Sequence, residues 1–173
     1  MSKRPECSEA EVVAWFAGQL QDDWFIEPVE VIIDRDEILV TGRLPEPASV
    51  PDGENTAEIA ADSRISAFRV DTRDTRIKIA RAAQTSWLRS VSWAAQCADL
   101  ERRFTTKSVP VMSRLHLDQR KTLDTLVETG VARSRSDALG WCVQQVQEHQ
   151  ADWISELEDA MKTVEKIRSK GPA

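Results

Sequence analysis

The sequence predicts an α+β fold, in which strands and helices alternate over the first hundred residues and helices dominate the end. Two runs rich in β-branched residues, 29–33 and 38–41, are separated by the charged turn 34–37, and this pattern is typical of a β-hairpin. Segments on both sides of the hairpin place apolar residues at helical spacing. The chain has 173 residues, which is enough for one large domain or two small ones.

The first element is a predicted helix that begins after Ser8. Glu11 follows Ser8 by three residues, which is the spacing of a capping box. Apolar residues then recur at helical spacing, and we expect this helix to end near Asp23. The hairpin comes next, followed by a loop over residues 44–55 whose prolines and glycine cannot continue a strand.

The segment 62–85 favours helix, and it interleaves apolar and basic residues. Asp71 or Thr72 can cap a new helix, so a break is expected there. The alternating residues 88–93 predict a strand with one apolar face, and a turn is expected at 99–101.

The next part of the chain predicts an extended segment over 109–115, followed by two helices. Asp118 can cap a first helix, 119–129, and Gly130 can end it in the left-handed conformation. Ser136, followed by an acidic residue, is the predicted N-cap of the second helix. The predicted buried side of this second helix consists of Ala138, Leu139, Cys142, Val143 and Val146.

The apolar spacing does not stop with the second helix. It continues to about residue 169, so we predict that the last helix extends that far. Such an extension needs a partner surface, either a second chain or the N-terminal part of this one. The residues that continue the stripe are Trp153, Leu157, Met161, Val164 and Ile167.

The charge is distributed unevenly along the chain. The formal net charge of −6 argues against nucleic-acid binding when the chain is taken as a whole. Residues 1–61, however, carry 4 basic and 14 acidic side chains, whereas residues 62–107 carry 10 basic and 5 acidic ones. Residues 108–150 are balanced, with five of each sign. The acidic third could keep the protein soluble or dock a basic protein, and nucleic-acid binding by the remainder is not excluded.

Composition and cysteine spacing narrow the function class. Cys7, Cys97 and Cys142 are odd in number and widely spaced, so they predict reduced thiols rather than a disulfide framework or a metal site. No apolar run approaches the roughly 20 residues of a membrane span, and the polar opening is unlike a secretory signal. We therefore expect a cytoplasmic protein without membrane contact. No nucleophile with a base partner is apparent, so neither an enzyme nor a cofactor is predicted.

One segment carries a more specific pattern. Its parts are Met-Ser-Arg-Leu at 112–115, Leu-Asp-Thr-Leu-Val at 123–127 and Gly-Val-Ala-Arg-Ser-Arg-Ser-Asp-Ala-Leu at 130–139. Over about residues 107–150 this strand, helix, short link and helix resembles the ribbon-helix-helix (MetJ/Arc-type) family of DNA-binding proteins. The resemblance implies a homodimer whose paired strands form a two-stranded ribbon in the DNA major groove. It also implies that the second helix holds a phosphate at its N-terminus.

The resemblance assigns DNA-contacting roles to eight residues. Outward strand positions would touch base edges, and an arginine there can make a bidentate contact to guanine, which contributes about 1–3 kcal/mol of discrimination. Residues at the start of the second helix would hold the phosphate. The positions are Lys107, Met112, Arg114 and His116 for the ribbon, and Arg133, Ser134, Arg135 and Ser136 for the phosphate.

The sequence thus predicts three parts: an α+β domain over 1–106, a ribbon-helix-helix module over 107–150, and a helix continuation with tail over 151–173. The leading hypothesis is a dimeric protein that binds double-stranded DNA and acts as a transcriptional regulator or chromosome-associated factor. Its N-terminal domain would sense a ligand, oligomerise or bind a protein. The alternative is a dimerisation scaffold, or an antitoxin-like or docking protein, that binds a protein partner without DNA.

Overall fold

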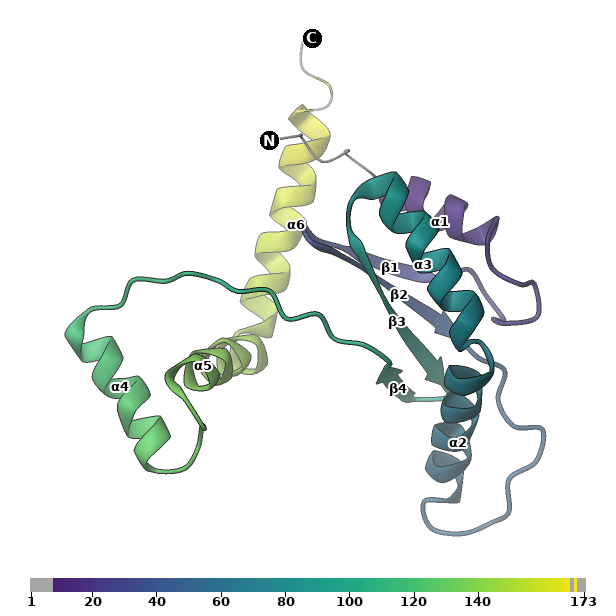
Figure 1. Ribbon diagram of the computed structural model, residues 1–173, viewed down its shortest axis with the longest axis horizontal. Helices are drawn as coiled ribbons and strands as arrows, with labels where there is room; N and C mark the ends of the chain where they lie inside the picture. The colour runs from purple at the N-terminus through teal and green to yellow at the C-terminus, as the bar shows by residue number, and fades with distance from the viewer. Residues whose placement is uncertain (1–7, 169, 171–173) are drawn as a thin grey trace. The chain divides into compact units, whose positions relative to one another are not determined.

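The structure is a computed structural model that describes residues 8–168 and residue 170 (Figure 1). Cys7 and the polar opening of the chain, for which a reduced thiol and no secretory signal are predicted, lie outside these residues. The chain divides into two compact units, Met1–Pro110 and Val111–Ala173, called here the N-terminal and C-terminal units. Helices and a four-stranded sheet confirm the α+β class.

The N-terminal unit is a sheet with helices on one face (Figure 1). The sheet order is β1-β2-β3-β4, in which β2 and β3 are parallel and the other pairs are antiparallel. The crossover that joins the two parallel strands contains α2 and α3, as parallel pairing requires. The elements are α1 (Glu9–Ala17), β1 (Glu30–Ile33), β2 (Glu37–Arg43), α2 (Thr56–Asp71), α3 (Arg73–Trp87), β3 (Ser90–Cys97) and β4 (Leu100–Arg103).

The first helix confirms the predicted capping box. The Ser8 hydroxyl accepts a hydrogen bond from the Glu11 amide at 3.2 Å, and the Glu11 carboxylate accepts one from the Ser8 amide at 2.9 Å. The helix ends at Ala17 rather than near Asp23, because Gly18 follows and glycine is a poor helix former. The predicted hairpin is confirmed as β1 and β2.

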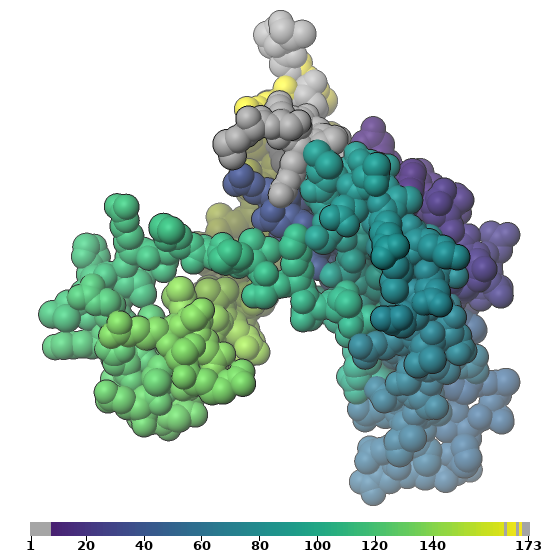
Figure 2. Space-filling view, viewed as in Figure 1, coloured from purple at the N-terminus to yellow at the C-terminus, as the bar shows by residue number. Residues whose placement is uncertain are grey.

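The core of this unit lies between the sheet and the helices. Val31, Val40 and Trp93 are neighbours across three strands, and all three are buried on the same face. Phe16 of α1 and Ile65 of α2 pack into the same cluster, so the helices cover that face. From the side shown in Figure 2, the side chains of α2 and α3 lie in front of the sheet.

Two details at the end of this unit differ from the sequence prediction. The strand predicted over 88–93 begins at Ser90, because Leu88 ends α3 in the left-handed region at φ 54°. The turn predicted over 99–101 lies one residue earlier, with Ala98 at φ 51°. The chain then returns as β4, an edge strand for which the sequence analysis predicted no strand.

Within the described residues, the regular secondary structure of the C-terminal unit is helical: α4 (Leu117–Glu128), α5 (Arg135–His149) and α6 (Ala151–Arg168). The single continuous last helix predicted from the sequence is wrong, because Gln150, at φ −127° and ψ 26°, separates α5 from α6. Residue 169, where that helix was predicted to end, lies outside the described residues. The segment 105–116 forms no strand, because none of the described residues pairs with it.

No helix in the described ranges combines the length and the apolar character that crossing a bilayer requires.

Candidate nucleic-acid interface

The turn between α4 and α5 brings the start of α5 beside α4. Gly130, at φ 79°, ends α4 as predicted, and its amide donates to the Val127 carbonyl at 3.1 Å. The Ala132 amide then donates to the Leu126 carbonyl at 3.1 Å. Ala132 is buried together with Leu123, so this turn is part of the small core of the unit.

The second helix is capped by a different serine from the predicted one. Ser134 is the N-cap, and its hydroxyl accepts a hydrogen bond from the Asp137 amide at 3.2 Å. The Asp137 carboxylate accepts in return from the Arg133 amide at 2.9 Å. Ser136, the predicted cap, is the second residue of α5 and is exposed. Both serines have an acceptor oxygen, but Ser134 is the one whose hydroxyl accepts from the amide three positions on, while the Asp137 carboxylate binds the amide before the cap.

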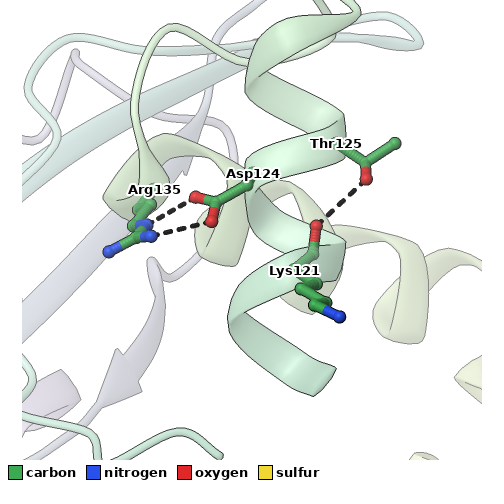
Figure 3. A network of polar contacts seen from close by, with 4 residues as sticks. All are labelled: Lys121, Asp124, Thr125 and Arg135. Carbon is green, nitrogen blue, oxygen red and sulfur yellow. Dashed lines mark hydrogen bonds and ion pairs between the residues drawn. The ribbon is translucent and has the colours of Figure 1, made fainter. Parts of the chain in front are cut away.

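An ion pair joins α5 to α4 (Figure 3). Arg135 Nε and Nη2 donate to the two carboxylate oxygens of Asp124 at 2.6 and 2.7 Å, which is bidentate geometry. Hydrogen bonding from Arg135 holds the pKa of Asp124 below its ordinary value. Since its guanidinium already binds a carboxylate, Arg135 orients α5 and is not a free phosphate contact.

The phosphate-binding capacity at this helix end rests on other groups. Arg133 is 95 % exposed, and its Nε lies 3.6 Å from the Asp137 carboxylate, which is a loose contact. The Arg135 and Ser136 amides belong to the first turn of α5, where amides have no acceptor within the helix. An exposed cation beside such amides, at the positive end of the helix dipole, suits an anion.

The extended segment before α4 exposes the predicted base-reading residues. Met112 is 94 % exposed and Arg114 is also exposed, whereas Leu115 packs against the core of the unit. His116 is the N-cap of α4 in place of the predicted Asp118, and its amide donates to the Gln119 side chain at 2.9 Å. Val111, which strand alternation would turn inward together with Leu115, is 83 % exposed, so the single chain does not show the alternation of a paired strand.

The predicted contact Lys107 belongs to the N-terminal unit. Its ammonium group donates to the Asp36 carbonyl at 3.0 Å and to the Ser90 hydroxyl at 2.8 Å, so it binds the ends of two strands. Lys107 therefore makes its contacts within the N-terminal unit, whereas the group at the start of α5 belongs to the C-terminal unit.

Two basic residues of α4 were absent from the predicted set. Arg120 Nη1 donates to the Leu115 carbonyl at 2.7 Å, so this cation stands beside the extended segment. Lys121 is exposed on the same helix (Figure 3). They were missed because the prediction used only the strand and second-helix positions of the family. The sequence did offer a signal for them, since Arg120 and Lys121 are adjacent cations within two helical turns of the extended segment.

The C-terminal unit leaves a large apolar surface uncovered. Val143 and Val146, predicted to be buried, are 55 % and 48 % exposed, because α5 packs on α4 through residues nearer its start. The apolar stripe of α6 is also exposed along its length. Its residues are Trp153, Leu157, Met161, Val164 and Ile167.

Among the described residues, no group of three or more His, Cys, Asp and Glu side chains is placed to hold a metal ion. Cys97, which is buried, and Cys142, which is half-buried, are free thiols.

Comparisons with known proteins divide the chain in two. Residues 10–103 match a family described as "Rv1265-like protein, N-terminal domain", and residues 116–168 match one described as "Mb1296 C-terminal domain". The chain is 46% identical over 171 residues to uncharacterized protein Rv1265 of Mycobacterium tuberculosis (strain H37Rv), which is 99% of this chain and 74% of that protein. Uncharacterized protein Mb1296 of Mycobacterium bovis matches with the same identity and the same coverage. No solved structure matches.

Proposed function

We propose that the chain, which belongs to the Rv1265-like family, is a homodimeric, ribbon-helix-helix type protein that binds double-stranded DNA; the proposal rests on the C-terminal unit and not on the family match. Its role would be to regulate transcription or to organise the chromosome in the cytoplasm. It would act by binding and not by catalysis. The observation that carries the proposal is an exposed extended segment without a strand partner among the described residues, directly followed by two helices with an uncovered apolar face.

The first support is the size of the core. Leu123, Ala132 and Ala138 are the buried apolar residues of the C-terminal unit, within the described part of the chain. Two short helices around so small a core are too little for independent stability. A second copy would cover the apolar face of α5 and would pair its extended segment with that of the first copy.

The second support is the distribution of cations. Pairing two segments 109–115 would present Met112 and Arg114 from both chains on one face of a ribbon, where the major groove accepts a two-stranded ribbon. Arg133 and the first amides of each α5 would then meet the flanking phosphates. Because residues 108–150 are neutral overall, DNA affinity would be modest and strongly dependent on salt.

The test is fluorescence anisotropy of a labelled duplex titrated with the full chain at two salt concentrations. We expect binding at low salt that weakens steeply as salt rises. Arg133→Ala should weaken binding to all duplexes and reduce the slope of log K against log salt by about one for each phosphate that it no longer neutralises. Arg114→Ala should cost about 1–3 kcal/mol on a preferred duplex.

Arg168→Ala is the matched control, because Arg168 is an exposed arginine of α6 outside the proposed interface. It should leave the affinity unchanged. The proposal fails if the wild-type chain does not bind duplex DNA at low salt, or if Arg114→Ala and Arg133→Ala both bind as the wild type does.

The alternative is a dimerisation scaffold or an antitoxin-like docking protein, and the exposed stripe of α6 favours it. That stripe lies beyond the part of the chain that resembles DNA-binding modules, so it can serve a protein partner. Under this alternative, nuclease treatment of a lysate would leave a specific protein partner bound to the full chain. Met161→Glu on α6 would release that partner.

A further inference from the structure

A second candidate site lies in the N-terminal unit, apart from the proposed DNA interface. It is an open cavity of about 240 Å³ between α2, α3 and the sheet. Three arginines line it, Arg69, Arg73 and Arg76, together with the aromatic rings of Trp93 and Phe104. None of the described residues that line it is acidic. Three guanidinium groups therefore meet at one cavity whose described wall holds no carboxylate.

Arg76 is the least expected of these cations, because only 6 % of it is exposed. Its Nε donates to the Thr72 hydroxyl at 2.9 Å, and its Nη2 donates to the Arg69 carbonyl at 2.6 Å. Its guanidinium carbon lies 4.7 Å from the centre of the Phe104 ring. Within the described residues Arg76 forms no ion pair, although a buried cation ordinarily needs one.

The neighbouring arginines add further positive charge around Arg76 and, among the described residues that line the cavity, no negative charge to balance it. Arg69 Nη2 donates to the Phe104 carbonyl at 3.3 Å, and the partner of Arg73 is the exposed carboxylate of Asp74 at 3.7 Å. Burial, and then the positive charges of Arg69 and Arg73, lower the pKa of Arg76. A bound anion would supply the negative charge that the described wall lacks.

Trp93 adds an independent observation. It is 4 % exposed, and its indole N–H has no acceptor among the described residues. A buried donor without an acceptor is costly, and tryptophan usually finds one. Trp93 lines the same cavity as the arginines. The unused donors of this cavity are therefore cationic and neutral N–H groups, and both kinds bind oxyanions.

We propose that this cavity binds a small organic anion, whose carboxylate or phosphate group is held by Arg73, Arg76 and the Trp93 indole. Ile77, Ala80 and Val91 complete the lining, so an apolar body beside the anionic group is also accommodated. Drug-sized ligands occupy about 300–1,000 Å³, and this cavity is smaller. The ligand is therefore a compact metabolite with one anionic group. The proposal does not depend on DNA binding.

The test uses proton–nitrogen NMR of the full chain labelled with ¹⁵N, in which Trp93→Phe identifies the Trp93 indole signal. Inorganic phosphate and benzoate are the two probes, titrated at constant ionic strength against chloride. We expect a saturable shift of the Trp93 signal with at least one probe, and the better probe identifies the anionic group. The indole signal of Trp153, in the other unit, should not move.

Arg73→Gln is the decisive variant, because Arg73 is exposed and its replacement leaves the core intact. It should weaken the binding at least tenfold, whereas Arg81→Gln, an exposed arginine of α3 outside the cavity, should not. The proposal is overturned if neither probe moves the Trp93 signal, or if Arg73→Gln binds as the wild type does. A Trp93 shift with duplex DNA alone would also overturn it, because the arginines would then serve nucleic acid. Loss of DNA binding in the anisotropy assay leaves this result unaffected.

Discussion

The arginines of this protein differ in the groups that they contact, and this difference distinguishes cations with a carboxylate partner from those proposed to bind an anion. Arg135 has a bidentate carboxylate partner on the neighbouring helix. Arg133, two residues earlier, is almost fully exposed, and Arg76 is buried without any ion pair among the described residues. The first fixes an interhelical contact, and the other two retain donors for an incoming anion. Proximity along the sequence is therefore a poor guide to the role of each arginine.

The Asp124–Arg135 pair gives a prediction about pH. The pKa of Asp124 is lowered in the folded chain. The pair therefore stabilises the fold fully at pH values above the unfolded-state pKa of this carboxyl group. This stabilisation is lost as pH falls through the folded-state pKa. Arg135→Gln should therefore be less stable than the wild type at neutral pH. The difference should shrink as pH falls below the ordinary pKa of an aspartate, about 3.9. Chemical denaturation across this pH range measures it, and a difference independent of pH would contradict the assignment.

At the scale of elements, sequence patterns predict the parts whose signal is local. The capping box at Ser8 and the hairpin 29–41 depend on neighbouring residues, and both are present in the structure. The edge strand β4 was not predicted, because Leu100–Arg103 is mostly charged and becomes a strand only by pairing with β3. The break at Gln150 was also missed, since the apolar spacing continues across it.

The candidate site was predicted only in part, for a similar reason. The group at 133–136 was placed correctly at a helix start, but its capping serine depends on the Asp137 pairing that only the structure shows. The arginine cavity could not be predicted, because its lining residues come from α2, α3 and β3. These elements meet only through the pairing of the sheet and the path of the crossover.

Gly42 in β2 gives a prediction at the same scale. A Cβ at this position would overlap the ring of Phe25, which packs against the strand. Gly42→Ala should therefore lower the free energy of unfolding by about 1–3 kcal/mol, as overpacking does. Gly140→Ala is the control, because Gly140 lies in α5 with open space around it, and alanine favours helix there by about 0.5–1 kcal/mol. Denaturant titration of both variants should give shifts of opposite sign, and equal shifts would contradict the packing.

At the scale of the whole molecule, the two units differ in how complete they are. The N-terminal unit has a continuous core that contains residues from the sheet and from all three helices. Within its described residues, the C-terminal unit has three buried apolar residues and two helices with exposed apolar stripes. The first therefore buries its own apolar surface, whereas the second leaves apolar side chains exposed, and the proposed dimer would cover them.

Val146→Glu tests the proposed dimer. Fully burying a valine contributes roughly 1.5–3 kcal/mol, and Val146 is 48 % exposed, so a partner could gain about half of that at each copy. A symmetric dimer loses the contribution twice, so the dissociation constant should rise by at least about tenfold. Sedimentation equilibrium measures it. Val70→Glu is the matched control, because Val70 is an exposed valine of α2 in the other unit. A wild-type chain that is monomeric at high micromolar concentration, or equal effects of the two substitutions, would contradict the homodimer.

The parallel pairing of β2 with β3 also determines the order in which the chain can fold. Glu37 pairs with Ser90, 53 positions later (90 − 37), so the sheet closes only after the crossover and β3 have followed β2 out of the ribosome. Until then the backbone N–H and C=O groups on the β3-facing edge of β2 have no strand partner, and such an edge can pair with another chain. The charged residues Glu37 and Arg43 stand at the two ends of that edge. Charged side chains disfavour such association, and pairing of this edge is expected to be slow because a long loop must close before its contacts form.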